Sequence, residues 1–160
     1  MSISTVRRFG VVGAGQMGRG IAQVAAAAGF EVILTDVTLA FAEGGKNKIA
    51  QALGKQVDKG KMKPEDRVAL LDRIEAREGL AELSRADIAV EAITENLDIK
   101  LRTFRDADAA LPKDAILASN TSSISITRLA SGTDRPEDFI GMHFMNPVPC
   151  LLYTSPSPRD

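Results

Sequence analysis

Short apolar runs alternate with longer amphipathic stretches along this chain. The apolar runs, each followed by a glycine-containing or polar turn, lie at 9–12, 31–36, 86–93, 115–120 and 138–144, with a weaker one at 74–77. Apolar residues at helical spacing fill the intervals 20–28, 38–59, 64–74 and 97–111, and a short stretch ends at Leu129. Strands that alternate with helices predict an α/β fold, doubly wound, with a mainly parallel sheet and helices on both of its faces.

Three of the predicted helices have specific packing expectations. The helix over 38–59 presents an apolar face made of Phe41, Ile49, Leu53 and Val57, interrupted by two glycines. A second helix begins at Pro64, a residue favoured in the first turn, and its buried stripe is predicted to be Val68, Leu71 and Ile74. Asn96 stands where it would cap the helix over 97–111.

Composition narrows the class of protein. The chain has 160 residues, 44% hydrophobic and 26% charged, which suits one soluble domain. A net charge of −1 gives no general attraction to nucleic acid or an anionic membrane. No apolar run approaches the roughly 20 residues that cross a bilayer, and the first eight residues lack a secretion signal's apolar core, so we expect a cytoplasmic protein. One cysteine, Cys150, and one histidine, His143, argue against a disulfide framework and a metal centre.

The first apolar run leads directly into glycines spaced G-x-G-x-x-G, at Gly13, Gly15 and Gly18. Gly13 would permit a tight turn, Gly15 would let a pyrophosphate approach the backbone, and Gly18 would let the helix pack closely on the strand. The intervening residues are Ala14, Gln16 and Met17. Because a strand precedes this motif and a helix follows it, the motif indicates a Rossmann-type dinucleotide site with phosphates at the helix N-terminus.

Asp36 ends the second apolar run, about 20 residues past the turn, where a ribose-binding acid is expected. Its carboxylate would accept hydrogen bonds from both ribose hydroxyls and would repel a 2′-phosphate. No arginine stands beside it, since Val37 and Thr38 follow. This pattern favours NAD over NADP, and the alternative is that Asp36 only caps the next helix.

Other polar residues have less specific patterns. Six lysines form a basic cluster that is either a solvated helix face or a contact for a phosphate-rich substrate tail: Lys46, Lys48, Lys55, Lys59, Lys61 and Lys63. The carboxyl ends of the predicted strands would present the glycine turn, Asp36, Glu95, residues 119–123 and His143 at one edge of the sheet. Taken alone, His143 fits a structural role, while Ser122 and Asn146 fit ordinary turns.

Four blocks, residues 13–23, 90–96, 119–123 and 143–149, together resemble the 3-hydroxyacyl-CoA dehydrogenase family, most closely its bacterial 3-hydroxybutyryl-CoA dehydrogenases. The resemblance extends from about residue 8 to 149. It implies oxidation of an L-3-hydroxyacyl-CoA to the ketone with hydride passing to NAD⁺. His143 would then be the general base, and an imidazole suits this task because it titrates near neutrality. The chain would be the NAD-binding domain of a homodimeric enzyme.

The resemblance also assigns roles to other residues. Ser122 would bind the reacting oxygen beside the nicotinamide, and Asn146 would lie near the same ring. Glu95 and Lys100 would contact the ribose region of the cofactor, or each would simply belong to a solvated helix start. Lys55 and Lys59 match positions that present charge to the CoA phosphates, although the surrounding residues differ.

The end of the chain departs from the family. We expect residues 1–149 to form the NAD-binding domain and residues 150–160, rich in Pro and Ser, to be a disordered tail from a frameshift, an assembly or adaptor artefact, or a cloning scar. The family continues with a glutamate that pairs with the histidine, where Ser155 stands here, and then with a helical domain that forms the dimer. We therefore expect NAD(H) binding but poor turnover. The alternatives are a non-catalytic NAD-binding module or another NAD-dependent hydroxyacid dehydrogenase.

Overall fold

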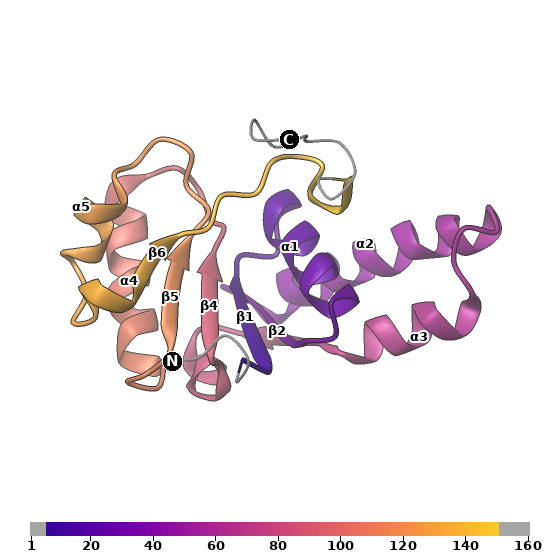
Figure 1. Ribbon diagram of the computed structural model, residues 1–160, viewed down its shortest axis with the longest axis horizontal. Helices are drawn as coiled ribbons and strands as arrows, with labels where there is room; N and C mark the ends of the chain where they lie inside the picture. Colours follow the sequence, from indigo (N-terminus) through magenta and orange to yellow (C-terminus); the bar gives the residue numbers. More distant parts are fainter. Residues whose placement is uncertain (1–5, 151–160) are drawn as a thin grey trace, which may run out of the picture.

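The computed structural model describes residues 6–150, which contain a six-stranded sheet in the order β3-β2-β1-β4-β5-β6 (Figure 1). Every pair of neighbouring strands is parallel. The strands are β1 (Arg8–Val12), β2 (Glu31–Asp36), β3 (Ile74–Glu78), β4 (Ile88–Glu91), β5 (Ile116–Ser119) and β6 (Phe139–Gly141). The predicted doubly wound, Rossmann-type fold is thus confirmed, and the strand order reverses between β1 and β4. Most of the predicted tail, residues 151–160, lies outside the described residues.

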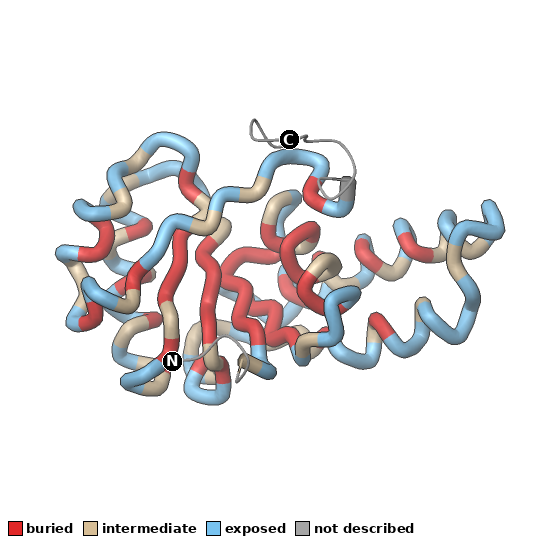
Figure 2. The backbone as a smooth tube through the Cα atoms, viewed as in Figure 1, coloured by how far each residue is buried: buried red, intermediate tan, exposed pale blue. Residues whose placement is uncertain are grey.

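Helices cover both faces of the sheet, and each face has its own apolar core. One core involves α1 (Gln16–Ala27), α2 (Leu39–Asp58) and α3 (Pro64–Asp72), and the other involves α4 (Leu97–Ala110), α5 (Ile126–Ala130) and the 3-10 turn η2 (Ala81–Arg85). Val11 belongs to the first core and Val12 to the second, as alternation along a strand requires. Two more 3-10 turns, η3 (Pro136–Asp138) and η4 (Val148–Cys150), precede and follow β6. Figure 2 shows the strands as a buried layer between the helices.

Two packing predictions were wrong, and both concern the helices that extend beyond the sheet. Phe41 is 62% exposed and Val68 is 53% exposed. The buried face of α2 consists instead of Ala42, Gly45, Ile49 and Leu53, so Phe41 lies one residue outside this stripe. In α3, Leu70 is the buried residue. Figure 1 shows α2 and α3 as a hairpin that projects from the sheet, and a projecting hairpin buries only a narrow stripe of each helix.

The segment after β6 returns along the carboxyl edge of the sheet to α1 (Figure 1). We call this segment, residues 142–148, the strap. The apolar run had predicted a strand over 138–144, and this was wrong at its end: β6 ends at Gly141, so His143 belongs to the strap. At its far end Val148 packs against Gly20 of α1, where an added Cβ would lie 2.9 Å from the Cβ of Val148. The missing side chain of Gly20 is therefore what allows the strap to reach the helix.

Candidate active site

The glycine turn between β1 and α1 has the geometry that its spacing predicted. Gly13 has a φ of +100°, and a Cβ there would lie 2.7 Å from the carbonyl oxygen of Ala92. A Cβ on Gly18 would lie only 1.7 Å from the carbonyl oxygen of Gly13. Gly15 differs from both, because a Cβ there would meet nothing within 4 Å. The space in front of the helix N-terminus is thus open at Gly15, which is the cradle that a pyrophosphate needs.

Asp36 faces this turn from the end of β2. Its Oδ2 accepts a hydrogen bond of 2.8 Å from the backbone N–H of Ala14, and its Oδ1 accepts one of 2.7 Å from Val37. The cap of α2 is Thr38, whose side chain accepts from the N–H of Phe41. The alternative that Asp36 only caps the next helix is therefore wrong. The carboxylate lies partly buried beside the glycine turn, where it can accept hydrogen bonds from the hydroxyl groups of a ligand.

A cavity of about 590 Å³, which we call the turn cavity, opens between the glycine turn and α4. Gly13, Gly15 and Asp36 line one side of it, and the other side includes apolar side chains such as Leu80 and Ile99. Apolar walls with one carboxylate at the glycine turn, that of Asp36, and a second on α4, that of Asp106, suit a flat base attached to a ribose.

A second cavity of about 420 Å³, which we call the histidine cavity, lies on the other side of the β4 carboxyl end. The two cavities share Ala92 and Ile93. The histidine cavity collects six of the predicted site residues: Met17, Glu95, Lys100, Ser122, His143 and Asn146. One ligand spanning both cavities would pass the glycine turn, which is the path of a dinucleotide across a switch point.

Ser122 and His143 meet at the mouth of the histidine cavity. Ser122 follows β5 and His143 follows β6, yet the serine Oγ and the histidine Nε2 are 3.1 Å apart. Both residues are exposed, so a substrate hydroxyl can reach them. A ring nitrogen beside a hydroxyl can take a proton from an alcohol held at the same place.

Side-chain and backbone contacts hold the strap along its length. The Asn120 Oδ1 accepts a hydrogen bond of 2.7 Å from the N–H of Phe144, and the Gln16 Nε2 donates one of 3.1 Å to the Oδ1 of Asn146. Together with the contact of Val148 on Gly20, these bonds place His143 over the cavity. Sequence reasoning placed Asn120 at this edge within residues 119–123 but missed its contact with the strap, because an asparagine after a strand carries no specific signal.

A buried ion pair lies behind the histidine cavity, between Glu91 of β4 and Lys100 of α4. The Lys100 Nζ is 2.6 Å from the Glu91 Oε1, and each side chain is 1% exposed. Glu91 was predicted only as part of a strand. A glutamate inside an apolar run, followed nine residues later by a lysine on the buried face of a helix, was the signal that could have identified it.

Some predicted residues lie elsewhere. Lys55 lies in the last turn of α2 and Lys59 caps its end, both exposed and outside the two cavities. Ser119 was expected to project at the carboxyl edge of the sheet, and this was wrong. It is fully buried and donates a hydrogen bond to Glu91. Among residues 6–150, no group of three or more His, Cys, Asp or Glu side chains is placed to hold a metal ion.

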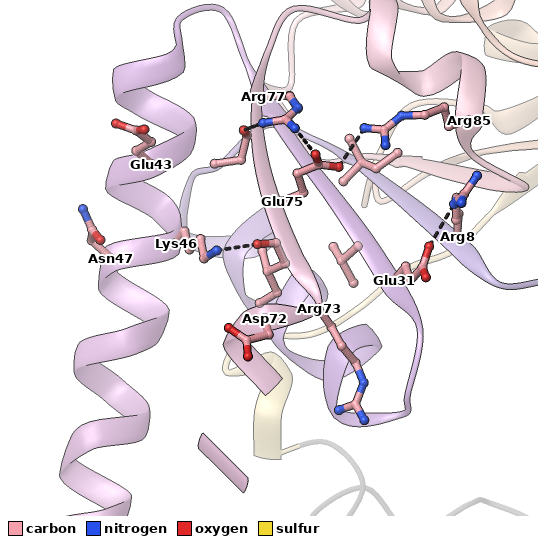
Figure 3. A pocket seen from close by; sticks show the side chains of 14 residues that line it. Arg8, Glu31, Glu43, Lys46, Asn47, Asp72, Arg73, Glu75, Arg77 and Arg85 are labelled. Carbon is pink, nitrogen blue, oxygen red and sulfur yellow. Dashed lines mark hydrogen bonds and ion pairs between the residues drawn. The ribbon is translucent and has the colours of Figure 1, made fainter. Parts of the chain in front are cut away.

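Another hollow, of about 860 Å³, surrounds the edge strand β3 (Figure 3). Its charged side chains largely satisfy one another: Arg85 pairs with Glu75 at 2.7 Å, and the Lys46 Nζ donates to the carbonyl oxygen of Ile74 at 2.6 Å. Lys46 is thus bound to the sheet edge, whereas the other five lysines of the basic cluster are exposed. Apart from Lys46 of the basic cluster, none of the predicted site residues lines this hollow, so the candidate site is at the carboxyl edge of the sheet.

Comparison with known proteins identifies a family profile and a set of relatives. The profile described as 3-hydroxyacyl-CoA dehydrogenase, NAD binding domain, matches residues 8–152. The 3-hydroxybutyryl-CoA dehydrogenase of Bradyrhizobium diazoefficiens is 48% identical over 148 residues, which cover 92% of this chain and 50% of the relative. A probable 3-hydroxybutyryl-CoA dehydrogenase of Deinococcus radiodurans is 49% identical over 90% of this chain and 51% of its own length. The chain spans about half the length of these curated relatives.

Solved structures agree with this relationship. The (S)-3-hydroxybutyryl-CoA dehydrogenase PaaH1 from Ralstonia eutropha is similar with a TM-score of 0.88 and 43% identity, over 91% of this chain and 51% of that one. The 3-hydroxybutyryl-CoA dehydrogenase from Escherichia coli K12 gives a TM-score of 0.87 and 36% identity, over 91% of this chain and 31% of that one. The range matched by the family profile, residues 8–152, includes all six strands described above.

Proposed function

This chain belongs to the NAD-binding domain family of the 3-hydroxyacyl-CoA dehydrogenases, and from that premise we propose that it is the cofactor-binding part of an NAD-dependent L-3-hydroxyacyl-CoA dehydrogenase. The glycine turn would hold the pyrophosphate, with Ala14, Gln16 and Met17 around it. Asp36 would bind the adenosine ribose in the turn cavity. The open space at Gly15 supports this placement, because it is where a side chain would displace the phosphates.

The nicotinamide end of the cofactor and the 3-hydroxyl group of the substrate would lie in the histidine cavity. NAD⁺, when bound, supplies the acceptor for the hydride. The His143 Nε2 takes the proton of the 3-hydroxyl, while the Ser122 Oγ donates a hydrogen bond to the same oxygen and holds it in place. Asn146, Glu95 and Lys100 complete the walls around the nicotinamide and its ribose. The observation that carries the proposal is the 3.1 Å contact between Ser122 and His143 at a cavity that adjoins the glycine turn.

The substrate is proposed to be an acyl-CoA of the 3-hydroxybutyryl type, because the relatives in B. diazoefficiens and R. eutropha are named 3-hydroxybutyryl-CoA dehydrogenases. Lys55 and Lys59, exposed at the end of α2, are available to the CoA phosphates. We further propose that the whole enzyme is a cytoplasmic homodimer that associates through the half that this chain does not span. In the part of the chain that the structure describes, no helix is long and apolar enough to span a membrane.

One assay tests this function. NADH formation from NAD⁺ and 3-hydroxybutyryl-CoA is followed with this chain, and with a version that carries the C-terminal half of a close relative. We expect both to bind NADH, and the extended version to turn over substrate far faster. A His143→Ala variant of the extended version should bind NADH normally and lose most of its rate, typically 100-fold to 10,000-fold for a general base.

The result also separates the alternatives. NADH binding without turnover in the extended version would favour a non-catalytic NAD-binding module. Turnover that is insensitive to the loss of His143 would favour a hydroxyacid dehydrogenase whose base is elsewhere.

A further inference from the structure

The ion pair between Glu91 and Lys100 is the most deeply buried charged group among the described residues. Its carboxylate has a full set of partners: besides Lys100, it accepts 2.7 Å hydrogen bonds from the backbone N–H of Ile93 and from the hydroxyl of Ser119. A buried pair of this kind rarely stabilises a fold more than apolar side chains of the same size would. Its presence therefore suggests a use other than stability.

Two branches connect the pair to the loop after β5. In the first, the Ser119 Oγ that donates to Glu91 also accepts a 3.2 Å hydrogen bond from the backbone N–H of Thr121. In the second, the Lys100 Nζ lies 3.9 Å from a Glu95 oxygen, and Glu95 accepts a 2.7 Å hydrogen bond from the Thr121 hydroxyl. Both branches end at Thr121, the residue immediately before Ser122. The backbone N–H of Ser122 itself points to Glu95, at 3.4 Å.

We propose that Glu91 is a positioning residue of the reacting end of the site. Its carboxylate holds the ammonium group of Lys100 in the wall of the histidine cavity and, through Ser119, holds the loop that presents Ser122 to His143. Glu91 is not exposed and does not touch a substrate, so it acts only through these neighbours. This inference rests on the proposed function for its meaning, but the geometry that it predicts can be measured separately.

The test uses Glu91→Gln, which keeps the shape of the side chain and removes its charge. We expect the dissociation constant for NADH, measured from the fluorescence of the bound nucleotide, to rise about tenfold, as the loss of one charge-assisted contact predicts. We also expect the ring signals of His143 to shift in the NMR spectrum. His143 is the one histidine of the chain, so its assignment is unambiguous.

A matched control exists on the other side of the fold. Asp108 and Arg135 form a second, somewhat less buried ion pair, with side chains 9% and 8% exposed, and neither residue lines the two cavities. We expect Asp108→Asn and Glu91→Gln both to lower the melting temperature, because each removes one charge of a buried pair. Asp108→Asn should leave the affinity for NADH and the His143 signals unchanged, which separates positioning from a general loss of stability.

Three results would contradict the positioning role of Glu91 or the proposed function. A folded Glu91→Gln protein with the wild-type NADH affinity and wild-type His143 signals would overturn the proposal. If Glu91→Gln does not fold, Ser119→Ala interrupts the loop branch while keeping the ion pair. It should shift the His143 signals, and unchanged signals would then overturn the proposal. Failure of the wild-type chain to bind NADH would contradict the proposed function, while the His143 signals would still decide the positioning role.

Discussion

Gly45 of α2 lies against Ala14 of the glycine turn so closely that a Cβ on Gly45 would stand 2.8 Å from the Cβ of Ala14 and 2.9 Å from its carbonyl oxygen. The second helix therefore packs directly against the glycine turn. Its neighbour Gly44 has nothing within 4 Å of the corresponding position. The two adjacent glycines, which weakened the helix prediction over 38–59, thus have different surroundings, and only one of them faces the turn.

This contact predicts opposite effects for two neighbouring substitutions. Gly45→Ala should cost about 1–3 kcal/mol of unfolding free energy, because neither Ala14 nor its carbonyl can move without shifting the turn. It should also weaken NADH binding. Gly44→Ala should stabilise the protein by about 0.5–1 kcal/mol and leave the affinity unchanged. Denaturant melts and NADH titrations of both variants provide the check, and equal behaviour of the pair would contradict the structural distinction.

Substitutions at Gly15 and Gly18 should have different effects, the first on NADH binding and the second on the stability of the fold. Gly15 has a φ of −66°, which other residues adopt, and open space before it, so Gly15→Val should fold and lose NADH binding. Gly18→Ala would drive a Cβ into the carbonyl oxygen of Gly13, and should cost at least about 3 kcal/mol of unfolding free energy. Thermal melts and NADH titration measure both. Unaltered affinity in folded Gly15→Val would refute the placement of the pyrophosphate.

Asp36 is expected to set the preference for NADH over NADPH. Asp36→Asn removes the negative charge that would repel a 2′-phosphate. It also replaces one of the two oxygens that accept hydrogen bonds from the N–H groups of Ala14 and Val37. NADH affinity should fall about tenfold and the discrimination against NADPH should narrow. Asp106→Asn is the control, since Asp106 lines the same cavity without contacting the turn. Titration of each variant with both nucleotides measures the ratio of the NADH and NADPH affinities. This ratio should change in Asp36→Asn and not in Asp106→Asn.

Because the strap is held at both ends, we expect Val148, which lies outside the histidine cavity, to affect the position of His143. Val148 is 3% exposed and packs on Gly20, so Val148→Ala should cost about 1–2 kcal/mol of unfolding free energy, at about 0.8 kcal/mol per buried CH₂. It should also loosen His143 and move its NMR signals. Met145, on the same strap, is 57% exposed, and Met145→Ala should change stability little. Identical His143 spectra for Val148→Ala and the wild type would show that the strap is not held at this point.

Prediction from sequence succeeded where the determinants are local. The strands, the glycine turn and the cap at Asn96, whose side chain accepts a 3.0 Å hydrogen bond from the N–H of Ile99, all follow from neighbouring residues. Prediction failed for Phe41 and Val68, because helical spacing alone does not say how wide a stripe the tertiary partners will cover. The roles of Ser122, His143 and the two lysines at the end of α2 stay predictions.

The sequence by itself determined the alternation of elements, the parallel sheet and the geometry of the glycine turn, because periodicity, glycine spacing and strand ends are properties of short segments. Only the tertiary structure decided that the Ser122 Oγ lies 3.1 Å from the His143 Nε2, that Glu91 is paired with Lys100, and that Gly45 supports Ala14. Each of these contacts joins segments separated along the chain. Their distances depend on how the sheet twists and how closely the helices pack, which no single segment encodes.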